Sequence, residues 1–142
     1  MKAIFSCLAA FVLLSSTSCK KDDDDPKPVT PTKENLTGSY KLTAATVAGV
    51  NIFNNSNESM NLYEACQRDD VYKLNADLSY QVADEGTQCS PSGSYTGTWS
   101  FVNSTTIVLD GETATITSFD GKNLSVSSVQ GGFTISSTFV KQ

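Results

Sequence analysis

The sequence predicts an all-β protein, folded as a small eight-stranded antiparallel up-and-down barrel. Apolar and polar residues alternate in eight short segments, and this two-residue period is typical of strands with one buried face. Turn-forming residues separate the segments, for example Asp110 with Gly111, Asp120 with Gly121, and Gly131 with Gly132. Most of these breaks are only a few residues long, so the neighbouring strands run antiparallel, because parallel strands need long crossovers.

Each of the eight segments has an apolar side that we expect to face a common core. Closing such strands into a barrel removes the exposed edges of an open sheet, which favours the barrel. A two-layer sandwich of the same strands is the alternative, since alternation does not distinguish the two architectures. The inward residues are Tyr40, Leu42 and Ala44; Tyr72 and Leu74; Leu78, Tyr80 and Val82; Trp99 and Phe101; Ile107 and Leu109; Ala114 and Ile116; Leu124 and Val126; and Phe133, Ile135 and Phe139.

One connection, residues 48–69, is too long for a tight turn. Asn57 is a suitable N-cap for a short helix over residues 58–66, and such a helix would cover one mouth of the barrel. An irregular loop with a single helical turn is the alternative, because the amphipathic spacing is weak. The residues expected on the inner side of the helix are Met60, Tyr63 and Leu62.

Residues 1–18 have the proportions of a lipoprotein signal peptide. Lys2 precedes an apolar stretch over residues 3–14, which is shorter than the roughly 20 residues of a membrane span. Small residues then lead to Cys19 and resemble a lipobox, although Ser16 and Ser18 replace its usual Leu and its Gly or Ala. We expect acylation of Cys19, which would anchor the mature protein to a membrane. The alternative is an ordinary secretory signal cut near Ser18.

Residues 19–34 are expected to form a flexible, acidic and proline-rich tether. Lys20 and Lys21 precede four aspartates, Asp22 to Asp25, and three prolines follow. A segment of this composition cannot bury a core and stays extended and solvated. A calcium loop is a poor alternative, because no Gly turn and no distal Glu occur at the required spacing. The folded domain is then expected over residues 35–142.

The composition disfavours nucleic-acid binding and most kinds of catalysis. The chain carries 15 acidic and 10 basic residues, a net charge of −5, and no histidine. Phosphate binding needs clustered Lys and Arg, and a Ser-His or Cys-His nucleophile needs a histidine. Asp69 with Asp70, and Asp84 with Glu85, are adjacent pairs that would point to opposite faces of a strand. We therefore expect no catalytic residue, no metal and no cofactor. These carboxylates are interpreted as solvated loop charges, or Asp69 as an acceptor of backbone hydrogen bonds.

Two cysteines remain in the expected folded domain, because Cys7 leaves with the signal and Cys19 is acylated. In an oxidising envelope Cys66 and Cys89 are expected to form a disulfide. The alternatives are two buried free thiols or a zinc site. Zinc is poorly supported, because the chain has no histidine and two thiolates fall short of four ligands.

Several segments together resemble the lipocalin-like domain of Bacteroidota lipoproteins. These are residues 36–42 (LTGSYKL), Cys66 shortly before residues 69–75 (DDVYKLN), Cys89, and residues 97–101 (GTWSF). The resemblance covers nearly the whole chain after the tether and implies a lipocalin-like barrel. Residues 75–78 (NADL) depart from it, because the family tends to have a Gly in this turn.

The resemblance also extends to export. Lys20, Lys21, Asp22 and Asp23 are similar to the signal that sends such lipoproteins to the outer face of the outer membrane. The localisation that it implies is the outer membrane, with the lipid-anchored domain facing the cell exterior.

A binding domain without catalysis is the function that these observations favour. It would recognise an envelope or extracellular macromolecule, a protein or a glycan; the alternative is a carrier of a small hydrophobic ligand inside the barrel. Short strands and many large inward groups favour a filled interior over a ligand cavity. The residues expected to line a ligand or to form the core are Tyr40, Leu42, Tyr72, Tyr80, Trp99, Phe101 and Phe133.

Overall fold

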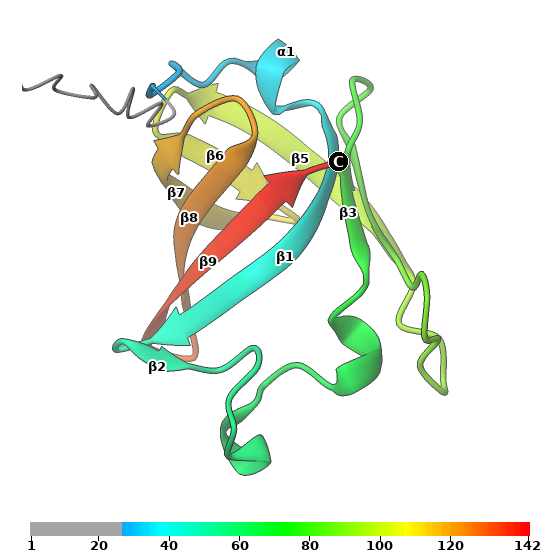
Figure 1. Ribbon diagram of the computed structural model, residues 1–142. Coiled ribbons are helices and arrows are strands. Elements are labelled where there is room, and N and C mark those ends of the chain that lie inside the picture. Colours follow the sequence, from blue (N-terminus) through cyan, green and yellow to red (C-terminus); the bar gives the residue numbers. More distant parts are fainter. Residues whose placement is uncertain (1–26) are drawn as a thin grey trace, which may run out of the picture.

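A computed structural model describes residues 27–142, which form a closed antiparallel β-barrel (Figure 1). The barrel has eight strands, as predicted. One short additional strand, β2, pairs with Thr46 and Val47 at the end of β1. Helical structure is limited to the single turn α1 (Lys33–Leu36) and two 3₁₀ turns, η1 (Glu58–Met60) and η2 (Ala65–Gln67). The strands are β1 (Gly38–Val47), β2 (Val50–Asn51), β3 (Val71–Leu74), β4 (Ser79–Ala83), β5 (Tyr95–Asn103), β6 (Thr106–Leu109), β7 (Glu112–Phe119), β8 (Asn123–Gln130) and β9 (Phe133–Lys141).

The strands follow one another as a meander, and β1 closes it. From β3 to β9, consecutive strands pair with one another. The first part of β1 pairs with β3 from Gly38 to Lys41, and β1 also pairs with β9 from Tyr40 to Val47. The pairing of the first strand with the last excludes the two-layer sandwich, because a sandwich leaves its sheets open.

A β-bulge in β1 shifts the predicted alternation by one residue. Leu42 pairs with Phe139, but the next pair is Ala44 with Thr138, so one residue of β1 is left over. Beyond the bulge Ala45 is fully buried and Ala44 is exposed. The prediction that Ala44 faces the core is therefore wrong, because the extra residue of the bulge moves the following side chains to the opposite face of the strand.

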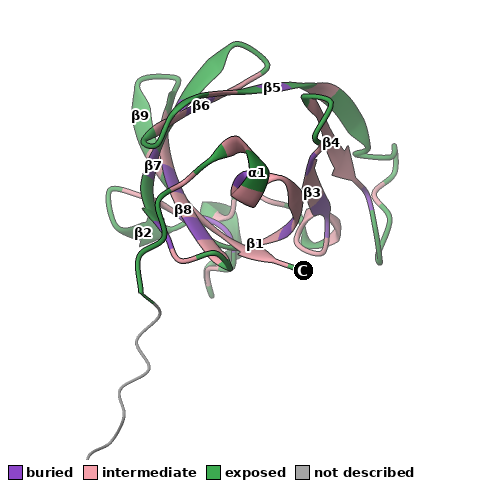
Figure 2. Ribbon diagram, turned by 90° about the horizontal axis from the view of Figure 1, so that it is seen from above, coloured by how far each residue is buried: buried purple, intermediate pink, exposed green. Residues whose placement is uncertain are grey.

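The upper core surrounds Trp99, which is 2% exposed and whose indole nitrogen donates to the carbonyl oxygen of Asn75 at 2.8 Å. Helix α1 lies over the barrel mouth above this core, as the view along the barrel shows (Figure 2). Its Leu36 is buried, and Leu36 O accepts a hydrogen bond from the Tyr40 hydroxyl at 2.7 Å. Residues of the expected tether also contact the barrel, since Val29 N donates to Phe119 O at 2.8 Å.

The hairpin turn between β3 and β4 departs from the usual choice of residue. The prediction that Leu78 faces the core is wrong, because Leu78 lies in the turn before β4 and is 39% exposed. Its φ of 70° is in the left-handed region that favours glycine. The turn is held by two backbone bonds, from Leu78 N to Asn75 O and from Trp99 N to Leu78 O. A left-handed position of this kind favours the Gly that the resemblance implied for this turn.

The opposite mouth is closed by the long connection between β2 and β3. Ile52 and Phe53 pack with Leu42 and Ala45 in a second apolar cluster, and Tyr63 contacts Phe53 edge-on with ring centroids 5.5 Å apart. The predicted helix over residues 58–66 is wrong, because the segment forms two separate 3₁₀ turns. Asn57 does cap the first of them, accepting from Ser59 N at 3.3 Å, but Met60 and Leu62 face solvent. Within residues 27–142 no helix has the length and apolarity needed to span a bilayer.

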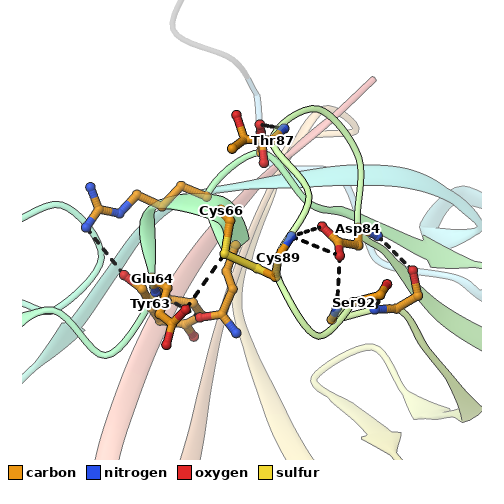
Figure 3. The surroundings of a disulfide bond; sticks show 12 residues. Tyr63, Glu64, Cys66, Asp84, Thr87, Cys89 and Ser92 are labelled. Carbon is orange, nitrogen blue, oxygen red and sulfur yellow. Dashed lines mark hydrogen bonds between the residues drawn. A yellow bond between two sulfur atoms is a disulfide. The ribbon is translucent and has the colours of Figure 1, made fainter.

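Cys66 and Cys89 form a disulfide with an Sγ–Sγ distance of 2.04 Å, as predicted. It joins η2 to the loop between β4 and β5, so the segment that closes the lower mouth is bonded to a neighbouring hairpin (Figure 3).

Replacing both cysteines by alanine should lower the free energy of unfolding by roughly 3 kcal/mol, because the bond closes a loop of 23 residues. The double variant avoids a leftover thiol, and denaturant unfolding measures the loss. Reduced wild-type protein serves as the control and should show a similar loss. An unchanged unfolding midpoint would contradict a stabilising role for the bond.

Candidate binding site

The interior of the barrel holds only a small apolar cavity of about 40 Å³. Small-molecule pockets usually measure about 300–1,000 Å³, so this space does not accommodate a typical hydrophobic ligand. Of the residues predicted as lining or core, Tyr40, Tyr72 and Tyr80 border the cavity, whereas Trp99 and Phe101 belong to the upper core and Leu42 to the lower cluster. The lining residues are Tyr40, Tyr72, Leu74, Tyr80, Ile107, Leu109, Leu124, Val126 and Phe139.

The three tyrosines at the cavity are neutral phenols near physiological pH. Burial raises the pKa of Tyr40 to about 12, and it raises the pKa values of Tyr72 and Tyr80 even further above their ordinary range. Tyr72 also packs edge-on against Phe139, with ring centroids 5.3 Å apart. These side chains therefore act as packing groups and do not exchange protons in this range.

Phe133 lies outside the core, contrary to the prediction, and is 64% exposed. Phe133 lies on the face of β9 that the alternation predicts, since Ile135 and Phe139 on the same face pack against the buried clusters. However, the last pair between β1 and β9 joins Val47 to Ile135, whereas the β8–β9 hairpin continues to the pair Gln130 and Phe133. Phe133 thus extends beyond the rim, where β1 no longer covers it.

The extended hairpin forms one wall of an apolar groove, and the connection after β2 forms the other. The groove has a volume of about 350 Å³ and no charged residue in its lining, and we call it the distal groove because it lies at the barrel end opposite α1 (Figure 1). Leu62, 66% exposed, is held in place by a backbone bond from Leu62 N to Ile52 O at 2.8 Å. The groove is lined by Val47, Ile52, Leu62, Gln130, Phe133 and Ile135.

Carboxylates organise the loops beside the disulfide (Figure 3). Asp69 accepts a hydrogen bond from Thr87 N at 2.8 Å, as one of the sequence hypotheses proposed. Asp84 accepts from Cys89 N at 3.2 Å and from Gly93 N at 2.9 Å, and it is buried rather than solvated. These bonds fix the loop between β4 and β5 and leave Asp84 no free oxygen for acid–base work.

Asp70 is also buried, at 4% exposure, which corrects its interpretation as a solvated charge. Its Oδ1 has no hydrogen-bond partner among the described residues. Burial raises the pKa of Asp70, and the nearby charges of Asp84 and Asp69 raise it further. The pKa of Asp84 is lowered instead, mainly because Gly93 N donates to its carboxylate. Burial without a partner for Oδ1 thus disfavours the charged form of Asp70, whereas backbone donors favour the charged form of Asp84.

Glu64 lies beside Cys66 and Cys89, and one potential metal-binding atom of each residue lies within 4.8 Å of the other two. The two sulfur atoms are bonded to each other, however, and a disulfide lacks the thiolate charge that zinc requires. In this bonded state the group is a poor metal site.

The variant Asp70→Asn should be more stable than the wild type at pH 7. A raised folded-state pKa means that ionised Asp70 destabilises the fold at neutral pH, and that this cost disappears as the pH falls through the folded-state value. The advantage of the variant should therefore shrink on acidification, as thermal unfolding between pH 7 and pH 3 would show. Asp84→Asn should behave oppositely and lose stability at neutral pH. Equal stability of Asp70→Asn and wild type at pH 7 would contradict the expectation.

Comparison with known proteins agrees with the fold. A family model described as a lipocalin-like domain matches residues 36–135, which is most of the chain. No curated protein gives a match. The matched range runs from Leu36, the last residue of α1, to Ile135 in β9, so it includes strands β1 to β8, the start of β9, the lower closing segment and the disulfide. The chain therefore belongs to the family of lipocalin-like domains, whose barrels in general bind ligands.

Proposed function

We propose that the protein is a non-catalytic, lipid-anchored binding module that recognises a macromolecule through the distal groove. The observation that carries the proposal is the contrast between two spaces. The interior cavity measures about 40 Å³ and the external groove about 350 Å³. Exposed apolar patches of this kind are typical of interaction sites on proteins.

The filled interior argues against a carrier of small hydrophobic ligands. Leu36 and α1 cover one mouth, and Ile52, Phe53 and Tyr63 cover the other. A ligand of ordinary size would have to displace part of this packing, which costs stability because protein interiors are close-packed. Recognition on the outer surface needs no such rearrangement.

The end of the barrel at which the described chain enters is the end that a membrane tether would attach to. The described chain enters at the α1 end of the barrel, whereas the distal groove lies at the other end (Figure 1). Cys19 and the export residues Lys20 to Asp23 lie outside the described residues. Anchoring at Cys19 would hold the α1 end towards the membrane and leave the groove facing away from it. Export to the cell surface, part of the same proposal, would present the groove to external partners.

The variant Cys19→Ser should move from the membrane fraction to the soluble fraction, because it lacks the acylated thiol. Fractionation of cells expressing each form, combined with palmitate labelling, measures both effects. Cys7→Ser is the matched control and should stay membrane-bound. A Cys19→Ser protein that still sediments with membranes, without label, would refute the anchor and leave groove binding to be judged separately.

The variant Phe133→Ser should bind isolated cell envelopes at least about tenfold more weakly than the wild type, since hot-spot aromatic side chains at interfaces commonly contribute that much. Saturable binding of the labelled soluble domain measures the effect. Val102→Ser is the matched control, because Val102 is an exposed apolar residue of β5 outside the groove. Equal binding by Phe133→Ser would contradict recognition through the groove. A lipid or fatty acid recovered from the purified protein would favour the carrier alternative.

A further inference from the structure

The loops at the groove end of the barrel are strongly acidic. This end, which we call the distal end, consists of the connections 48–70, 84–94 and 131–132. Arg68 is the only basic residue in them. The connections at the α1 end are balanced, with Lys27, Lys33 and Lys122 against Glu34, Asp77 and Asp120. The acidic residues of the distal end are Glu58, Glu64, Asp69, Asp70, Asp84 and Glu85.

Two of these carboxylates belong to the same segment as the groove wall. Glu58 and Glu64 flank Leu62 in sequence, and both are exposed. Arg68 donates to Asn54 Oδ1 at 3.4 Å and to Tyr63 O at 3.3 Å, and its single positive charge offsets only part of the charge of the two glutamates. Two strand lysines lie near this end: Lys41 is opposite Val71 at the start of β3, and Lys73 is paired with Glu85 at 3.2 Å. At the distal end negative charges thus outnumber the positive charges of Arg68, Lys41 and Lys73.

We propose that the occupant of the distal groove is a polypeptide segment that carries an apolar side chain flanked by lysines or arginines. This inference rests on the proposed function and names the chemistry of its partner. The uncharged lining receives the apolar side chain, and the exposed carboxylates of the distal end, Glu58 and Glu64 among them, attract the flanking cations. Apolar burial supplies most of the affinity, whereas charge complementarity sets specificity and association rate.

The same charges disfavour the other occupants of an apolar groove. A second copy of this chain, docked through the same face, would bring two acidic ends together. An anionic lipid surface would be repelled for the same reason. A neutral partner would gain nothing from the carboxylates. A basic polypeptide is the partner that uses both features.

The test uses a labelled heptapeptide with a central Leu-Phe-Leu and two lysines on each side. Its two controls replace the lysines by glutamine or the three apolar residues by serine. In fluorescence anisotropy with the disulfide-bonded domain, the lysine peptide should bind about tenfold more tightly than the glutamine peptide at low salt. The difference should shrink in 1 M salt, where charges are screened within about 3 Å. The serine peptide should not bind.

Variants of the domain separate the two features of the site. Glu58→Gln combined with Glu64→Gln should weaken binding of the lysine peptide about three- to tenfold, because exposed ion pairs contribute modestly. The same double variant should leave the glutamine peptide unchanged. Glu34→Gln, at the α1 end, is the matched control and should change neither affinity. Phe133→Ser should abolish binding of the lysine peptide and of the glutamine peptide. Circular dichroism verifies that this variant is folded.

The outcomes distinguish this inference from the proposed function. Equal affinities for the lysine and glutamine peptides, or no binding of either, would overturn the charged partner, while Phe133-dependent binding to envelopes would still support the proposed function. A Phe133-dependent dimer in sedimentation, or Phe133-dependent binding to phosphatidylglycerol vesicles, would also overturn the basic polypeptide in favour of that occupant. If Phe133→Ser binds envelopes as the wild type does and the peptides do not bind, both proposals fail.

Discussion

The pairing of β1 with β9 is the interaction on which the rest of the structure depends. It joins the first strand of the barrel to the last, so a meander of short strands encloses a single interior. Eight short strands enclose a space that side chains can fill, and here they fill it around Trp99 and the cavity tyrosines. Because the interior is occupied, binding is more readily accommodated on the outside of the barrel than within it.

The same pairing explains the position of the candidate site. β1 ends at Val47, opposite Ile135, and the β8–β9 hairpin continues past it. The excess length exposes Phe133, and the closing segment after β2 supplies Leu62 across from it. The groove is therefore a consequence of unequal strand lengths at a rim where the barrel is otherwise complete.

Departures from ordinary packing rules concentrate at this end of the molecule. Phe133 and Leu62 are large apolar side chains in solvent, and Asp70 is a buried carboxyl with an unpaired oxygen. Each of these features costs stability, and the disulfide between Cys66 and Cys89 offsets part of that cost by constraining the same loops. Local conflicts of this kind are expected where a surface serves binding rather than folding.

The sequence by itself determined the strand faces, the turns, the antiparallel order and the pairing of the two remaining cysteines, because these depend on local periodicity and on residue chemistry. Tertiary structure decided where those patterns stop applying. Ala44 and Ala45 exchange places because a bulge in the β1–β9 ladder inserts a residue, and no local signal announces it. Packing over the two barrel mouths decides the local structure of the segments that cover them. These segments are the single turn α1 and the two 3₁₀ turns that replace the predicted helix over residues 58–66. Phe133 has the periodicity of a core residue, yet it is exposed, because burial depends on how far the neighbouring strand extends.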